Sequence, residues 1–484
     1  MAALSDVGKR GLVALFTAAL ASSCSLTTTT VDKCSKNADC RTAFGGGRVC
    51  AADGLCESAP VNPRCTAAFP DDVLTRPESY PNAILIGALF DRNVESHRAR
   101  ENAIRLAVRQ VNEANGLDGR LFGVVLCDIA EDAKYDSAKR TDAAVASAKY
   151  LADVVGVPAI VGPSASTDVL PVFEAIKDLD VLLISPAATS PALTGADTKT
   201  PTNEAPGLLW RTAPPDTLQG AAIERHLRDA FPTANTIALV QEKGAYGDAL
   251  AAVFTEKFQV EGRSVRPFVF ANTSARDAAV QDAGAEGLPV VLFISSQTSD
   301  AIAFLNSANT LASYATTRLF LTDAAANTDL LKGASGASAA FPRVIGSRPA
   351  VPQGPTYELF RTSFTAAFRQ DPNTFSFVPH TYDAAWLTFY GSARSLRVEK
   401  KITGTGIARG LRLISAGGAE IPIRPDNWTR IADALSGAAA VNLTGTSGPL
   451  DYDPVTEETA ASVDIWKISA DGTKIETVTT IDTR

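Results

Sequence analysis

The chain has 484 residues, with 45 Lys and Arg against 53 Asp and Glu, and its formal net charge is −8. A hydrophobic fraction of 45% and a charged fraction of 20% are ordinary for a globular protein and exclude a disordered or collagen-like chain. The acidic balance argues against nucleic-acid binding, and three widely separated histidines, His97, His226 and His380, weaken the case for zinc or histidine-based catalysis.

Residues 1–23 are predicted to be a secretory signal. A short basic region precedes an apolar run over 11–21, which is shorter than the about 20 residues that a membrane-spanning helix needs. The run ends in the letters ASSC, so Cys24 resembles the lipidated cysteine of a bacterial lipobox, although Ala21 stands where leucine is usual and plain secretion stays open. Ser25 is typical of sorting to the outer membrane. We expect a periplasm-facing lipoprotein of the cell envelope, in the outer rather than the inner membrane, with a membrane contact only through its lipid.

Residues 24–79 are predicted to form a cysteine-rich linker. Four of its cysteines have the spacing C-x5-C-x9-C-x5-C in a segment that is poor in large apolar residues, so disulfides are its expected source of order: Cys34, Cys40, Cys50 and Cys56. Three pairings of these four are possible and the sequence does not choose among them. Cys65 and Cys127 remain, and a bond between them would fasten the linker to the main domain. A metal site is the competing interpretation, but no CxxC spacing supports it.

From residue 80 onward, short apolar runs alternate with helical patterns. The run Ala83–Leu89 predicts a buried strand, and the helix after it has an apolar face that ends at Asn115-Gly116. Further helices are expected over 142–154 and near 168–178. The further strands are expected at Phe122–Leu126, Ala159–Gly162, Val181–Ser185, Thr236–Val240, Val265–Phe270, Val290–Ile294 and Leu319–Thr322. This βαβ alternation predicts an α/β fold with doubly wound parallel sheets in two lobes.

Two turns rich in small and hydroxyl residues follow neighbouring strands of this pattern, at 162–167 and 184–190. Ligands of open α/β sheets bind beyond the carboxyl ends of the strands, and free backbone N–H groups before a helix suit an anion such as a carboxylate. The alternative is that Ser166 and Thr189 only cap helices. Two such turns side by side favour a binding site.

From about residue 80 to its end, the chain resembles the type I periplasmic binding proteins, in particular their leucine/isoleucine/valine-binding branch. The resemblance rests on motifs in matching order: VGPSAST (161–167), ISPAATSPALT (184–194), RTAPPDTLQG (211–220), VQEKGAYGDAL (240–250) and SGPLDYDP (447–454). It implies two lobes that are joined by three hinge crossings, near 211–216, 347–352 and 445–448. The implied lobes are residues 80–212 with 348–445, and residues 213–347 with 446–484.

The resemblance also implies a site for an α-amino acid between these lobes. It places Ser166 and Thr189, with the backbone of Ala187 and Ala188, around the ligand carboxylate. Tyr246 would contact the ligand from the second lobe, and Asp323 would pair with its amino group. A zwitterion needs amide groups on one side and a carboxylate on the other, which agrees with this arrangement. Taken without the resemblance, Asp323 would be interpreted as a helix cap.

One departure concerns the ligand side chain. After Val290–Ile294 the branch often has aromatic residues, whereas this chain has Ser295-Ser296-Gln297-Thr298, so a polar ligand becomes conceivable. The loop after the first strand, Phe90-Asp91-Arg92-Asn93, carries a charged pair that could contact such a ligand or could be solvated.

The sequence predicts no enzyme. It has no GxSxG elbow, no Walker-type loop and no GxGxxG after a strand. Asp128, Glu131 and Asp132 form an acidic cluster that is interpreted as a solvated loop. We expect a monomeric solute-binding lipoprotein without cofactor or metal, which serves an ABC-type importer. The alternative is a sensory or structural envelope lipoprotein that uses the same fold to bind a partner protein or an envelope polymer.

Overall fold

The computed structural model describes residues 33–483, except 45, 81, 261, 416–418 and 438. The predicted signal segment 1–23 and Cys24 lie outside the described residues. The chain divides into two compact units, one up to Ala59 and one from Pro60 onward. Within the described ranges, no helix combines the length and the apolar character that a membrane crossing requires.

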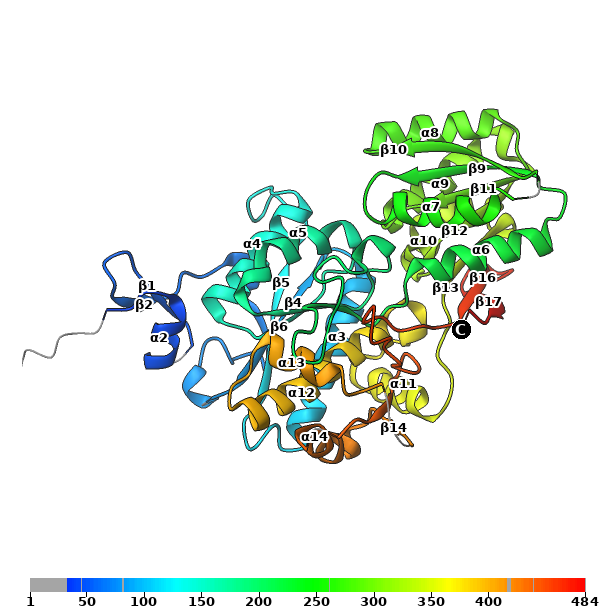
Figure 1. Cartoon of the computed structure of the whole chain (residues 1–484). Helices are drawn as coiled ribbons and strands as arrows, with labels where there is room; N and C mark the ends of the chain where they lie inside the picture. Colours follow the sequence, from blue (N-terminus) through cyan, green and yellow to red (C-terminus); the bar gives the residue numbers. More distant parts are fainter. Residues whose placement is uncertain are drawn as a thin grey trace, which may run out of the picture. The chain divides into compact units, whose positions relative to one another are not determined.

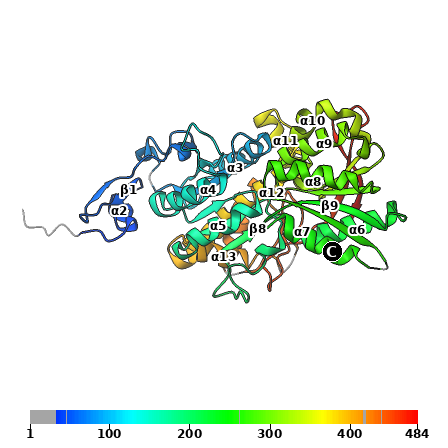
Figure 2. The ribbon, with the colours of Figure 1, turned by 90° about the horizontal axis from the view of Figure 1, so that it is seen from above.

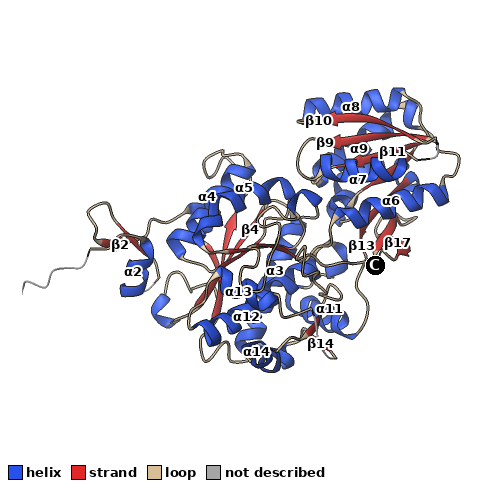
Figure 3. Ribbon diagram, viewed as in Figure 1, coloured by secondary structure: helices blue, strands red, loops and turns tan. Residues whose placement is uncertain are grey.

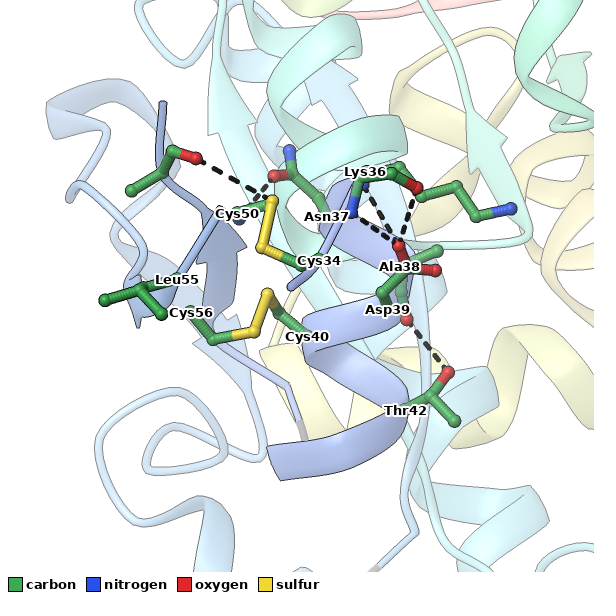
Figure 4. Close-up of a disulfide and its surroundings, with 12 residues drawn as sticks. Cys34, Lys36, Asn37, Ala38, Asp39, Cys40, Thr42, Cys50, Leu55 and Cys56 are labelled. Atoms are coloured by element: carbon green, nitrogen blue, oxygen red, sulfur yellow. Dashed lines mark hydrogen bonds between the residues drawn. A yellow bond between two sulfur atoms is a disulfide. The ribbon is translucent and has the colours of Figure 1, made fainter. Parts of the chain in front are cut away.

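The unit up to Ala59 is a helix cross-linked to a hairpin. Its elements are α2 (Asn37–Phe44) and the antiparallel strands β1 (Arg48–Cys50) and β2 (Cys56–Ser58). Disulfides join Cys34 to Cys50 and Cys40 to Cys56, as Figure 4 shows. The expectation of a disulfide framework is confirmed, and the structure selects one of the three pairings. The three sulfur atoms that could have suggested a metal site, within 4.8 Å of one another, all belong to these two bonds.

The larger unit contains a six-stranded sheet, which we call the first sheet. All neighbouring strands run parallel except the edge pair of β3 and β5. In spatial order the strands are β3 (Ala67–Phe69), β5 (Phe122–Asp128), β4 (Ile84–Phe90), β6 (Ala159–Val161), β7 (Leu182–Ser185) and β8 (Leu209–Arg211). Alternate residues of each strand point to opposite faces, so both faces are apolar and both are covered by helices.

Helices that are far apart in sequence cover one face of the first sheet together. In Figure 1 the orange helices α12 and α13 lie beside the blue-to-cyan α3, and α12 packs along α3. This layer consists of α3 (Glu95–Glu113), α11 (Pro355–Phe368), α12 (Val378–Glu399), α13 (Gly404–Leu411) and α14 (Trp428–Ser436). The opposite face is covered by α4 (Arg140–Lys149) and α5 (Ser166–Ile176). A short parallel pair, β14 (Glu420–Pro422) and β15 (Asn442–Thr444), borders α14 in sequence. We call the first sheet with these elements the first lobe.

A seven-stranded sheet forms the second lobe. Its order is β10 (Ser264–Phe270), β9 (Thr236–Glu242), β11 (Val290–Ile294), β12 (Arg318–Leu321), β13 (Val344–Pro349), β16 (Val463–Ile468) and β17 (Ile475–Ile481). The strands β10 to β13 are parallel, whereas β16 and β17 are antiparallel to their neighbours. Figure 3 shows the strands of both sheets in red between blue helices.

Two pairs of helices cover the second sheet. Figure 2 shows α6 (Asp216–Ala230) and α7 (Gly247–Phe258) on one side of β9 and α8 (Thr273–Ala285) and α9 (Thr298–Thr310) on the other. The cores agree with this view, because Leu239 packs with the first pair and Val240 with the second. The short α10 (Thr328–Gly333) follows β12. The expected α/β architecture of doubly wound parallel sheets is therefore confirmed.

Contacts around the lobe boundaries add detail to the expected division, which stays a prediction. Strand β3 lies within the predicted linker and pairs with β5, and the Cys65–Cys127 disulfide fastens this stretch to the same strand. Near the expected third crossing, the Ser447 amide donates to Asp383 of α12 at 2.7 Å. A residue within the Gly445–Gly448 turn therefore still bonds to the first lobe.

Gly162 is expected to tolerate no side chain. It follows β6 with φ of +96°, and a Cβ there would lie 2.6 Å from the carbonyl oxygen of Leu89. Gly162→Ala should lower the free energy of unfolding by about 2 kcal/mol or more, because both the backbone conformation and the contact become unfavourable. Urea titration checks this, with Gly336→Ala as control, because a Cβ at Gly336 meets nothing within 4 Å. Equal stability of the two variants would contradict the expectation.

Candidate functional site

A cleft of about 120 Å³ lies beyond the carboxyl ends of strands from both lobes. This is the position at which open α/β sheets bind ligands. The volume is smaller than the roughly 300–1,000 Å³ of sites for drug-sized ligands and suits a small solute. The lining residues follow β4, β5, β6, β7, β9, β11 and β12 or precede α12: Val94, Ser96, His97, Arg100, Ile129, Arg140, Ser164, Ala165, Ser166, Asp168, Ala187, Tyr246, Ser296, Gln297, Thr298, Ser299, Asp323, Ala324 and Phe377.

On the second-lobe side of the cleft, Asp323 and Tyr246 form a buried pair. The Tyr246 hydroxyl donates to Oδ1 of Asp323, and Gln219 Nε2 donates to the same oxygen at 3.1 Å. Asp323 is 4% exposed, and burial raises the pKa of its carboxyl. Thr322 occupies the cap position of the short helix that begins at Asp323, so Asp323 itself is not a helix cap. The pair offers a carboxylate to a cationic group in the cleft.

A second acid, Asp216, lies beside this pair at the start of α6. It is fully buried, the Thr189 hydroxyl lies beside it, and no basic side chain of the described ranges forms an ion pair with it. Burial and the charge of Asp323 raise the pKa of the Asp216 carboxyl well above its ordinary value. Two acids this close favour a proton on one of them.

The raised pKa of Asp216 predicts a pH-dependent effect of Asp216→Asn. The folded protein keeps the Asp216 proton at pH values at which the unfolded chain, with an ordinary pKa of 3.8, has lost it. Raising the pH above about 4 therefore destabilises wild type through this group, and asparagine removes the effect. The gain in unfolding free energy of the variant over wild type should grow as the pH rises above about 4 in urea titrations. A gain that does not change with pH would contradict this.

On the first-lobe side, the amino end of α5 faces the cleft. Ala165 holds the cap position and, among the described side chains, none caps the first amide groups of the helix. Ser166 is therefore not the cap that the alternative interpretation required. Its Oγ accepts a hydrogen bond from the Ser190 amide at 3.3 Å. The uncapped N–H groups and the positive end of the helix dipole suit an anionic group.

The turn after β7 is brought into the cleft only in part. Ala187 lines the cleft, whereas Ala188 and Thr189 do not. The Ala188 amide already donates to Ser185 Oγ at 3.1 Å, and the Thr189 carbonyl accepts from the Asp216 amide at 2.8 Å. Four of the six predicted ligand residues thus meet at one cleft, and the other two lie directly behind it.

Basic residues from the first lobe complete the cleft. Arg140 bonds to Asp168 at 2.8 Å and reaches across to Gln297 Oε1 of the second lobe at 2.5 Å. Arg100 is 7% exposed, and burial lowers its pKa to about 10. Burial lowers the pKa of His97 well below its ordinary value, and the positive charges of Arg100 and Arg140 lower it further. His97 is therefore neutral.

Sequence reasoning missed Asp216, Gln219 and Arg100 as residues of this site or its immediate surroundings. Asp216 and Gln219 lie in the motif RTAPPDTLQG, which carries the family resemblance but does not by itself indicate that these two side chains reach the site. Arg100 is one of several arginines along α3, and its burial distinguishes it from the exposed Arg98 on the same helix. No spacing in the sequence could have shown that burial.

The chain belongs to the family described as "Receptor family ligand binding region", whose model matches residues 99–471. Its fold is that of the type I periplasmic binding proteins, and the similarity to the leucine/isoleucine/valine-binding branch is confirmed by its relatives.

Two relatives illustrate that similarity. A leucine-, isoleucine-, valine-, threonine- and alanine-binding protein of Pseudomonas aeruginosa is 30% identical over 173 residues, which are 36% of this chain and 41% of the relative. The Leu/Ile/Val-binding protein homolog 1 of Brucella melitensis is 28% identical over 204 residues, which are 42% of this chain and 46% of the relative. The matched segments cover less than half of each relative.

Solved structures share the fold at low sequence identity. The leucine-binding protein LivK of Thermotoga maritima has a TM-score of 0.62 at 16% identity and covers 83% of this chain and 99% of its own. LivJ of Streptococcus pneumoniae, in complex with isoleucine, has a TM-score of 0.60 at 18% identity, with 82% and 99% covered. A solute-binding protein of R. palustris, in complex with 4-hydroxybenzoate, has a TM-score of 0.63 at 15% identity, with 83% and 97% covered.

Proposed function

We propose that this protein captures an α-amino acid between its two lobes and acts as an extracytoplasmic solute-binding protein for ABC-type import. The observation that carries the proposal is the arrangement of one cleft, in which a buried acid with its tyrosine lies on one lobe and an uncapped helix start lies on the other. The role is binding without catalysis, in line with the names of the relatives as binding proteins.

The chemistry of the two sides fits the two ends of a zwitterion. Asp323 and the Tyr246 hydroxyl would bind the ammonium group, because a charge-assisted hydrogen bond is about twice as strong as a neutral one. The first amide groups of α5, with Ser166 and Ala187, would bind the α-carboxylate. Asp216, Ala188 and Thr189 would support these contacts from behind. The ligands named for the solved structures, isoleucine and 4-hydroxybenzoate, both carry a carboxylate, which supports this anion site.

Closure of the lobes would trap the ligand. Two hydrogen bonds illustrate the contact between the lobes. Arg140 donates to Gln297, and the Ser376 hydroxyl donates to the Ala326 carbonyl at 3.1 Å. A ligand that contacts both lobes binds the closed state more tightly than the open state and so shifts the population toward it.

Delivery to a permease and a lipid anchor at Cys24 are further parts of the proposal. The anchor, its location in the outer rather than the inner membrane and the monomeric state rest on sequence alone. An importer lies in the inner membrane, so an outer-membrane anchor would instead favour a sensory or structural role with a partner protein or an envelope polymer. Genes for a permease and an ATPase beside this one would favour import.

Thermal unfolding with a panel of the twenty amino acids and 4-hydroxybenzoate tests the proposed function. A ligand at 100 times its Kd should stabilise the protein by about 2.7 kcal/mol, which appears as a raised Tm. At least one amino acid should produce this shift. A panel in which no amino acid raises the Tm would contradict amino-acid capture and favour the partner-binding role.

A further inference from the structure

We propose that the cleft selects an amino acid with an acidic side chain and that Arg100 binds the side-chain carboxylate. This inference rests on the proposed function and names the ligand class of the same site. It starts from Arg100, a charged residue of the described cleft lining to which the proposed function assigns no group of the ligand.

Arg100 is a buried guanidinium whose hydrogen-bond partners are all neutral. It projects from α3, and its Nη1 donates to Ser164 Oγ at 2.8 Å while Nη2 donates to the Ser376 carbonyl at 3.2 Å. The guanidinium carbon lies 5.4 Å from the centre of the Phe377 ring. No carboxylate of the described ranges forms an ion pair with it. A guanidinium has five N–H donors in a fixed plane, so donors remain for a group in the cleft.

The other charged side chains of the described cleft lining have a partner either in the structure or in the proposed ligand. Arg140 pairs with Asp168, whose second oxygen accepts from the Thr141 hydroxyl at 2.5 Å. Asp323 is assigned to the ligand ammonium, and the amide groups of α5 to the α-carboxylate. The charges of Asp323 and Asp329 act on Arg100 only from a distance, without a hydrogen bond to it. When a neutral zwitterion is bound, Arg100 therefore has no carboxylate in direct contact, and a buried charge without a hydrogen-bonded partner is unfavourable. A second carboxylate on the ligand removes this mismatch.

The surroundings of Arg100 also disfavour an aliphatic side chain. Three polar residues line the cleft near Arg100. Ser96 and His97 precede it on α3, and Ser164 accepts its hydrogen bond. A leucine side chain at this place would displace water from the guanidinium and return no hydrogen bond. A planar carboxylate can instead accept two parallel N–H bonds from arginine.

Isothermal titration calorimetry with matched ligand pairs tests the inference on the full-length protein. The probes are L-glutamate against L-glutamine, L-aspartate against L-asparagine, and L-leucine. We expect an acidic amino acid to bind at least tenfold more tightly than its amide and than leucine. Arg100→Gln should abolish this preference, with a loss of at least tenfold for the acid and little change for the amide. The matched control is Arg98→Gln, which alters an exposed arginine on the same helix and should change neither affinity.

The outcomes separate the two proposals. Tighter binding of an amide or of leucine than of the acids would overturn the inference and leave amino-acid capture intact. Equal losses for acid and amide in Arg100→Gln would mean that Arg100 binds the α-carboxylate, which also overturns it. Binding of no amino acid would contradict the proposed function itself. If Arg100→Gln fails to fold, the affinities of the wild-type protein for acid, amide and leucine still test whether the cleft selects an acidic side chain.

Discussion

Asp323→Asn is expected to abolish amino-acid binding while the free protein stays at least as stable as wild type. Asparagine keeps an oxygen that can accept the hydrogen bonds of Tyr246 and Gln219, and it removes a buried charge beside Asp216. The ligand ammonium, however, loses its anionic partner. Removing one member of a buried charge pair weakens binding by about 2–5 kcal/mol, which corresponds to a loss of affinity of about 30-fold or more.

Calorimetric titration measures this loss, and urea unfolding measures the stability of the free variant. Asp229→Asn serves as control, because this acid lies on α6 in the same lobe and is exposed, so neither quantity should change. An affinity of Asp323→Asn equal to that of wild type would remove Asp323 from the site.

Loss of the Cys65–Cys127 disulfide is expected to destabilise the larger unit by about 4 kcal/mol. The bond closes a loop with a sequence separation of 62 residues, and the chain-entropy relation for a loop of about 60 residues gives this size. The double variant Cys65→Ala/Cys127→Ala avoids a free thiol. All four tryptophans, Trp210, Trp386, Trp428 and Trp466, lie in this unit, so urea unfolding followed by tryptophan fluorescence reports on it.

Cys40→Ala/Cys56→Ala is the matched control for this experiment. Its disulfide lies in the unit up to Ala59, which forms a compact unit separate from the tryptophans. The fluorescence transition of this variant should coincide with that of wild type. A transition of Cys65→Ala/Cys127→Ala that also coincides with wild type would contradict a stabilising role for the long-range bond.

Strands with continuous apolar runs could be predicted from the sequence, whereas the edge strands β3 and β17 could not. The run Val290–Ile294 is β11 to the residue, because a strand buried on both faces must be apolar throughout. Strand β17 is exposed at most of its positions and rich in threonine, so it produces no such run. Strand β3 has three residues, too few for any pattern. The disulfide pairing in the small unit likewise could not be predicted, because the spacing of cysteines along the chain does not determine which sulfur atoms form a bond.

The site could be predicted where a residue lies at a strand end and could not where its role depends on burial. Ser166, Tyr246 and Asp323 each follow a strand, and the parallel sheets bring those ends to one cleft. Asp216 begins a helix after a hinge, and its burial against Asp323 depends on tertiary packing. Arg100 differs from its neighbours on α3 only through contacts with residues far along the chain.

A crystal structure of the protein with the amino acid that raises its Tm most tests the central claim most directly. The account predicts the ligand nitrogen at about 3 Å from the Asp323 carboxylate and the Tyr246 hydroxyl, and the α-carboxylate at the first amide groups of α5. A ligand bound outside this cleft, or held with its carboxylate toward Asp323, would contradict the account.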